Sequence, residues 1–196
     1  MTAASEGDIK TFSKLMVLCD GNIALLETQS SNNNLGDTLI HVATRFGHSN
    51  IVVALLNIGV NIELRNRIGE TPLLVAAESG QMAVAAVLLG KGANEDTCIT
   101  DTGLKPIHLA AMFSHNDVAK LLLSRHPTSI NCQESIRMCT PLHLAVGLDH
   151  PDMVRFLLEQ EGICLSLRDS DGRTAYQLSN KFQEIRNIFH EFGVRH

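Results

Sequence analysis

Histidine is the residue type of this chain best suited to chemistry. Six of its nine histidines form three pairs with members seven residues apart, namely His41/His48, His108/His115 and His143/His150. Neutral imidazole is a common zinc ligand, so these pairs could belong to a metal site. Leu74 stands where a further pair would begin, which interrupts any regular series of ligands. A structural role for the histidines is the alternative.

Motifs for other catalytic or cofactor chemistry are missing from the sequence. Neither a Gly-x-Gly-x-x-Gly nor a Gly-x-x-x-x-Gly-Lys-Ser/Thr phosphate loop occurs. Gly90 and Gly92 are interpreted as the end of a helix, where glycine commonly takes a left-handed conformation. Serines and aspartates are present, but no nucleophile motif surrounds them. We therefore expect no catalytic residue and no cofactor.

The cysteines indicate the redox environment of the chain. Their number is odd and no Cys-x-x-Cys pair occurs, which differs from disulfide frameworks and zinc ribbons. We expect reduced thiols in a cytoplasmic or nuclear compartment. The five are Cys19, Cys98, Cys132, Cys139 and Cys164.

Composition and charge exclude several classes of partner. The chain has 196 residues, 44% hydrophobic and 4% aromatic, with a formal net charge of −5. A nucleic-acid module usually has a basic balance or stripe, so DNA or RNA is not expected as a partner. The sequence contains no run of 18 apolar residues, so no membrane span is predicted. The first eight residues lack the features of a secretory signal.

A six-residue sequence motif recurs along the chain. The elements that contain this motif must position any functional residues. Residues 140–145 (TPLHLA) read as a helix start, with Thr140 as cap and Pro141 at the first helical position. Variants begin at Thr38, Thr71, Lys105 and Thr174. A turn residue precedes each phrase at intervals of 33, 34, 35 and 34 residues, namely Gly36, Gly69, Gly103, Met138 and Gly172.

A period near 33 with a T-P-L-H-x-A phrase is the signature of ankyrin repeats. The chain resembles this family over roughly residues 3–192. The resemblance implies an all-α solenoid of helix–turn–helix units, with short β-turn loops as right-angled fingers and a concave face. It also implies that the first His of each pair ties adjacent loops by hydrogen bonds and is no metal ligand.

The period divides the chain into a partial first unit, four full repeats and a shortened capping unit. We expect helices near residues 9–18, 38–46, 50–58 and 182–190, and neighbouring units that bury each other's Leu, Val and Ala faces. The predicted units are 1–32, 33–65, 66–98, 99–133, 134–168 and 169–196.

The resemblance implies partner binding at the loop tips and at the exposed face of the first helices. Several residues there are larger and more apolar than solvent exposure favours, and a contiguous apolar patch marks an interface. The alternative is that Phe46 and Phe113 pack between repeats. We predict a groove edged by Arg65, Arg67 and Arg137 for an acidic, apolar segment. The predicted partner-binding residues are Arg45, Phe46, Arg67, Ile68, Glu78, Leu104, Met112, Phe113, Ile136, Arg137, Met138 and Leu148.

The loop before residues 140–145 departs from the repeat. Met138 replaces the turn glycine, and a side chain there disfavours a left-handed turn, so residues 136–139 are a candidate edge of the binding surface. We expect a monomeric, non-catalytic scaffold or adaptor that binds a protein or peptide. The alternatives are a recruiting domain of a larger enzyme, channel or ubiquitin-ligase adaptor, a regulator like the inhibitors of kappa-B, or a pathogen effector.

Overall fold

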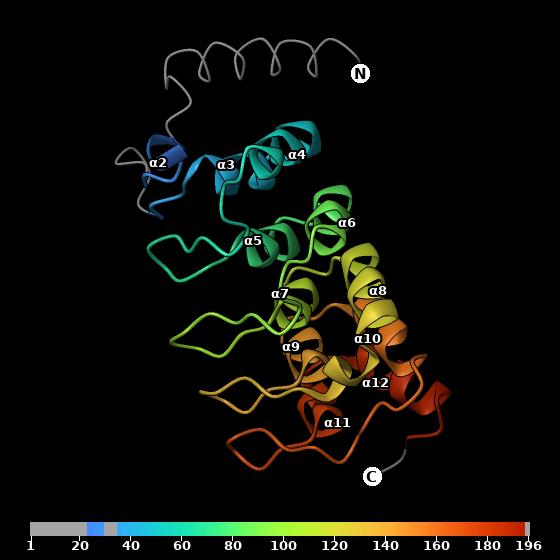
Figure 1. Ribbon diagram of the computed structural model, residues 1–196. Helices are drawn as coiled ribbons and strands as arrows, with labels where there is room; N and C mark the ends of the chain where they lie inside the picture. Colours follow the sequence, from blue (N-terminus) through green and yellow to red (C-terminus); the bar gives the residue numbers. More distant parts are fainter. Residues whose placement is uncertain (1–22, 30–34, 195–196) are drawn as a thin grey trace. The chain divides into compact units, whose positions relative to one another are not determined.

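The computed structural model describes residues 23–29 and 35–194, which form parts of two compact units, Met1–Asn94 and Glu95–His196. The described residues of both units form helices joined by loops (Figure 1). The predicted helix at residues 9–18 and Cys19 lie outside the described residues, as does most of the predicted first unit.

The first unit consists of helix pairs. The short helix α2 (Ile23–Leu26) precedes α3 (Leu39–Arg45) and α4 (Ser49–Asn57), which pack together, and α5 (Pro72–Glu78) and α6 (Met82–Gly90) form the next pair. α3 packs on α5 and α4 packs on α6. The core is aliphatic, and its fully buried side chains include Ile40, Leu55, Leu73 and Leu88.

The second unit repeats the arrangement and ends in a shorter pair. Here α7 (Pro106–Met112) packs on α8 (Asn116–Arg125) and on α9 (Pro141–Gly147), and α9 packs on α10 (Pro151–Leu158). The last pair is α11 (Ala175–Leu178) and α12 (Gln183–Glu191), joined by the 3-10 turn η2 (Ser179–Lys181). Another 3-10 turn, η1 (Pro127–Asn131), follows α8.

Local sequence explains where these helices begin. Thr71, Thr140 and Thr174 cap α5, α9 and α11 by accepting a hydrogen bond from the third helical N–H, and proline follows the cap in α5 and α9. The helices predicted at 38–46, 50–58 and 182–190 agree with α3, α4 and α12 to within one residue at each end. The buried face of α12 consists of Ile185, Ile188 and Phe189.

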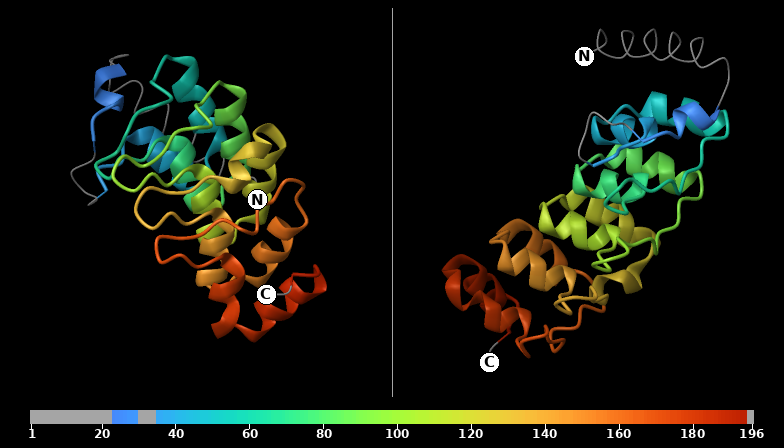
Figure 2. Two further views of the ribbon diagram at one scale, coloured as in Figure 1. Left: turned by 90° about the horizontal axis from the view of Figure 1, so that it is seen from below. Right: turned by 90° about the vertical axis from the view of Figure 1, so that its left-hand side faces the viewer.

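Long loops project from one side of the helices in each unit (Figure 2). One backbone hydrogen bond joins each loop to the next within a unit. Arg67 N–H donates to the carbonyl of Leu35, Ser135 to Thr102, and Ser170 to Arg137, with N···O distances of 2.7–2.9 Å. Glycine is favoured at position 103 in particular, because its φ is +72° and an added Cβ would lie 2.9 Å from the Ser135 nitrogen.

Although a methionine side chain disfavours a left-handed turn, the loop at position 138 adopts one, contrary to the expectation from the sequence. Met138 has φ 53°, in the same region as Gly69, Gly103 and Gly172 at the corresponding positions. The Glu134 carboxylate holds the turn closed by accepting hydrogen bonds from the N–H groups of Arg137 and Cys139, at 2.8 and 3.0 Å, and of Ile136, at 2.7 Å. These contacts offset the strain of the methionine conformation.

The all-α helix–turn–helix architecture expected from the sequence is confirmed for the described residues. The repeat boundaries themselves stay a prediction. Within residues 23–29 and 35–194, no helix has both the length and the apolar character needed to cross a membrane.

Candidate functional site

The first histidine of each pair links the cap of its helix to the following loop. His143 Nδ1 lies 2.7 Å from the Thr140 hydroxyl, and its Nε2 lies 3.1 Å from the Arg173 carbonyl. His41 makes the same two kinds of contact, with Nε2 at 3.0 Å from the carbonyl of Glu70. Burial lowers the pKa of both rings below the ordinary value. These neutral rings are occupied by structural hydrogen bonds, as the sequence interpretation expected.

His108 has a related role with a different neighbour. Its Nε2 lies 3.0 Å from the Cys132 carbonyl and 3.5 Å from the Cys132 sulfur. Burial lowers the pKa of His108 to about 4 and raises the pKa of the Cys132 thiol to about 11. This pair is therefore neutral near pH 7 and has no activated thiolate. Within the described parts of the chain, no three His, Cys, Asp or Glu side chains are grouped as metal ligands.

Arg45, predicted as a partner-binding residue, lies in an internal ion-pair network of the first unit. Its Nε lies 3.2 Å from Asp37, its Nη1 lies 2.5 Å from Glu78, and its Nη2 lies 3.5 Å from Glu70. The Asp37 and Glu70 side chains are each only 2% exposed. Asn66 Nδ2 donates to both buried carboxylates, at 2.8 and 2.9 Å. The Arg45 charge thus compensates buried carboxylates of its own chain, and Glu78 is its ion-pair partner.

Electrostatics in this network follow from its burial. Burial raises the pKa of Glu70 above the ordinary value, and the hydrogen bond from Asn66 opposes that rise. For Arg45, burial alone would lower the pKa, but hydrogen bonds to Glu78 and Asp37 raise it. The guanidinium therefore stays charged, and it stabilises the ionised forms of its neighbours.

Other predicted residues of the first unit are exposed. Phe46 is 67% exposed, beyond the C-terminal end of α3, and its ring stacks on His48 with centroids 6.3 Å apart. Packing of Phe46 between repeats, the alternative interpretation, is therefore not observed. Ile68 and Arg67 are also exposed, at the tip of the loop before α5.

The second unit carries a corresponding set of exposed apolar side chains. Phe113 is exposed at the end of α7 and stacks on His115, as Phe46 stacks on His48. Ile136 and Met138 are exposed on the loop before α9, and Leu104, on the preceding loop, is half-buried. Large apolar side chains thus recur at helix ends and loop tips of both units.

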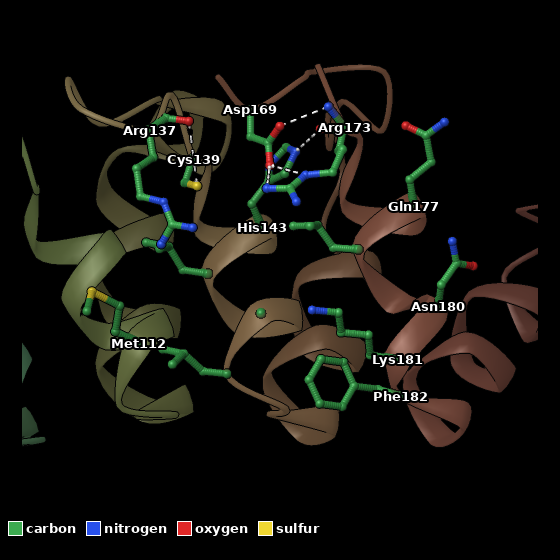
Figure 3. Close-up of a pocket in the computed structure, with 14 residues that line it drawn as sticks. Met112, Arg137, Cys139, His143, Asp169, Arg173, Gln177, Asn180, Lys181 and Phe182 are labelled. Atoms are coloured by element: carbon green, nitrogen blue, oxygen red, sulfur yellow. Dashed lines mark hydrogen bonds and ion pairs between the residues drawn. The ribbon is translucent and has the colours of Figure 1, made fainter. Parts of the chain in front are cut away.

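A pocket of about 510 Å³ lies between α9 and α11 in the second unit (Figure 3). Three of the predicted residues line it together, namely Met112, Arg137 and Leu148. The structure does not bring Phe113, Ile136, Met138 or Leu104 into its lining. The other lining residues come from α9, from the loop before it and from residues 169–182, and none of them was predicted as partner-binding. They are Cys139, His143, Leu144, Gly147, Asp169, Arg173, Gln177, Leu178, Asn180, Lys181 and Phe182.

Asp169 and Arg173 form a polar cluster on one wall of the pocket, at the top of Figure 3. Arg173 donates to Asp169 from Nε and Nη2, at 3.0 and 2.9 Å, and also pairs with Asp171. Burial alone would raise the pKa of Asp169, but hydrogen bonds from Arg173 lower it below the ordinary value. This wall thus holds one cation, Arg173, that is already paired with two carboxylates of its own chain.

Sequence comparison places the chain among repeat proteins. A family model described as Ankyrin repeats (3 copies) matches residues 1–101, 58–134, 88–169 and 107–188. The chain is 30% identical over 162 residues to the Caenorhabditis elegans protein named Transient receptor potential cation channel subfamily A member 1 homolog, covering 81% of this chain and 10% of that protein. It is 31% identical over 133 residues to the E3 ubiquitin-protein ligase XBAT32 of Arabidopsis thaliana, covering 67% and 25%. Over 125 residues it is 34% identical to human NF-kappa-B inhibitor alpha, covering 58% and 36%. The chain therefore spans about a tenth to about a third of these relatives.

Proposed function

Because this chain belongs to the ankyrin-repeat family, we propose that it is a non-catalytic scaffold or adaptor that binds a partner protein or peptide. Ankyrin repeats are protein-interaction modules. The binding surface is formed by the exposed ends of the first helices and by the loop tips. The observation that carries this proposal is the recurrence of exposed Phe46, Phe113 and Leu148 directly after α3, α7 and α9.

Physical chemistry supports a binding role for these side chains. Their exposure leaves apolar surface in water, and burial against a partner releases roughly 25 cal/mol per Å² of apolar area. Aromatic, Met and Arg residues are enriched at the centres of protein interfaces. A preformed helical scaffold also loses little conformational freedom on binding, which favours affinity.

The direct test is affinity capture with the wild type beside a Met112→Ser/Phe113→Ser double variant. We expect the double variant to lose the captured partners while thermal melting shows a folded chain. Phe192→Ser is a matched control, because Phe192 is an exposed aromatic residue outside the predicted surface, and it should retain the partners. Recovery of the same proteins by the double variant would place binding elsewhere.

A second candidate function is recruitment within a larger protein. The similarity of this chain to portions of a channel homologue and of a ubiquitin-protein ligase favours it. A regulator resembling NF-kappa-B inhibitor alpha is a further form of the same binding role. The sequence that flanks this segment in its gene distinguishes these cases, since a channel or ligase domain would be encoded beside it.

The finer properties of the module are part of the proposal. The chain acts as a monomer in the cytoplasm or nucleus, needs no cofactor and binds neither nucleic acid nor membrane. Its acidic balance and cysteine usage support these assignments. Analytical ultracentrifugation tests the monomer, and fluorescence microscopy of a tagged chain tests the compartment.

A further inference from the structure

The pocket between α9 and α11, called here the α9–α11 pocket, lies where the chain departs from the repeat in two ways. One is a glycine at the end of α9, and the other is the short helix α11. α9 ends in Gly147, whereas α3, α5 and α7 end in Arg45, Glu78 and Met112. Apart from Gly147, its two chain neighbours and the nearby backbone of α9, no heavy atom of the described residues lies within 4 Å of the position that a Cβ at Gly147 would take. The absent side chain leaves open space at the end of α9.

The shortened α11 forms the other side of the pocket. α7 and α9 each have seven residues, but α11 has four and continues into η2. The chain therefore turns before a full first helix is complete. This turn places Asn180, Lys181 and Phe182 along the pocket.

The floor of the α9–α11 pocket is apolar. Leu144 lies in α9 and Leu148 directly follows it. Leu178 ends α11 and Phe182 directly follows η2. Leu148 is 48% exposed, so a partner that covers it removes apolar surface from water. The volume of about 510 Å³ is within the range of pockets that enclose a ligand.

Two cations at the edge of this floor have no partner carboxylate in the part of the chain that the structure describes. Among the described residues, no side-chain hydrogen bond or ion pair engages the guanidinium of Arg137 or the ammonium of Lys181. Arg173, in contrast, is already paired with the carboxylates of Asp169 and Asp171. Figure 3 places Arg137 and Lys181 on different sides of the pocket, and both side chains point toward it.

The charge of the pocket opposes that of the chain. The whole chain has a formal net charge of −5, yet at the edges of this pocket lie two cations, Arg137 and Lys181, that pair with no carboxylate of the described residues. Complementary charge directs recognition and raises the rate of association. Because the cations are separated by an apolar floor, one small anion does not match both. A chain with an apolar side chain between two carboxylates does.

We propose that the α9–α11 pocket binds an acidic segment of a partner protein, with a large apolar side chain on the floor and flanking carboxylates at Arg137 and Lys181. The inference rests on the proposed function and specifies the partner chemistry. Leu or Phe in the segment contacts Leu144, Leu148 and Phe182. Glu or Asp on either side pairs with the two cations.

The test uses fluorescein-labelled synthetic peptides and fluorescence polarisation. Each peptide has a central Leu or Phe with Glu two residues before and two residues after it, and matched peptides carry Lys or Gln at those places. We expect the Glu peptides to bind the wild type at least about tenfold more tightly than the Lys peptides. Equal affinity for the Glu and Lys peptides would overturn the proposal.

Variants locate the binding in the pocket. Gly147→Leu places a side chain in the open space, so we expect it to weaken Glu-peptide binding by about tenfold or more while circular dichroism shows a folded chain. Gly90→Leu is the matched control, because Gly90 also ends a helix and its Cβ position is equally open beyond its own helix among the described residues. Wild-type affinity in Gly147→Leu would contradict the assignment.

Charge variants test the flanking contacts. Lys181→Gln should weaken Glu-peptide binding by about two- to fivefold, as expected for an exposed ion pair. Lys181→Glu combined with Arg137→Glu should invert the preference toward the Lys peptides, and an unchanged preference would contradict the charge argument. If the peptides fail while protein capture still depends on Met112 and Phe113, this inference is wrong and the proposed function stands. If both fail, the proposed function is wrong as well.

Discussion

Replacing Arg45 with Leu tests whether this residue serves the fold rather than a partner. The substitution retains an apolar stem and removes the guanidinium that lies 3.2 Å from Asp37 and 3.5 Å from Glu70. Those two carboxylates are 2% exposed and would lose their cationic partner, although Asn66 would still donate to both. The fold therefore loses its compensation for two buried negative charges.

The expected cost follows from burial. Removing one partner of a fully buried ion pair costs about 3–5 kcal/mol, because the remaining charge is uncompensated. The Arg45 side chain is 24% exposed, so water screens part of the interaction and we expect about 3 kcal/mol at pH 7. The cost should shrink toward pH 5. Glu70 already has a raised pKa, and loss of Arg45 raises it further, so the folded variant binds a proton more readily than the unfolded chain and gains stability as the pH falls.

Urea unfolding followed by circular dichroism at about pH 7 and pH 5 measures both effects. Arg125→Leu is the control, because its ion pair with Glu95 has side chains 45% and 23% exposed and should contribute less than about 1 kcal/mol. The reasoning is refuted if Arg45→Leu costs no more than Arg125→Leu at pH 7. It is also refuted if the cost of Arg45→Leu grows as the pH is lowered.

Three further predictions concern packing, titration and the backbone. Leu88→Ala, at a side chain with no exposed area, should cost about 2–5 kcal/mol, and a nearly unchanged thermal melting temperature would contradict the helix register. His108 should make stability fall as the pH drops from about 6.5 to about 4, because the unfolded chain takes up a proton in that window and the folded chain does not. The loss is about 3 kcal/mol at 1.36 kcal/mol per pKa unit, and His108→Gln should show a shallower pH slope of unfolding free energy, with parallel slopes contradicting the assignment. Met138→Gly should stabilise the chain by about 0.5–1 kcal/mol, since φ 53° is strained for methionine, and a lower melting temperature would argue against that strain.

Much of the fold is predictable from the sequence because its determinants are local. A threonine cap followed by proline specifies where α5 and α9 begin, and recurrence of the phrase specifies the spacing of the units. The conformation of Met138 was not predictable in this way. It depends on Glu134, whose carboxylate accepts the N–H groups of the turn, and a propensity rule for residue 138 alone omits that contact.

The candidate site is predictable only in part. Exposure of Phe46, Phe113 and Leu148 follows from their repeat position, which lies directly after the first helix of a unit. The lining from residues 177–182 was missed because α11 ends before a full repeat helix would. A signal was present in the sequence, since the last unit is short and Gly147 occurs where Arg45, Glu78 and Met112 stand in the other units.

A variable position of the repeat does not by itself identify a functional residue, and two arginines of this chain have different surroundings at such positions. Arg45 and Arg137 both occupy positions that the repeat leaves variable, and both were predicted to bind a partner. Arg45 ends beside Asp37 and Glu78, whereas the guanidinium of Arg137 reaches no carboxylate of the described chain. The free energy of an uncompensated cation at an apolar pocket decreases when a partner supplies the carboxylate, and a cation already paired gains little from the same partner. The distinction therefore depends on pairing in three dimensions, which makes Arg137 a stronger candidate than Arg45 for contact with another protein.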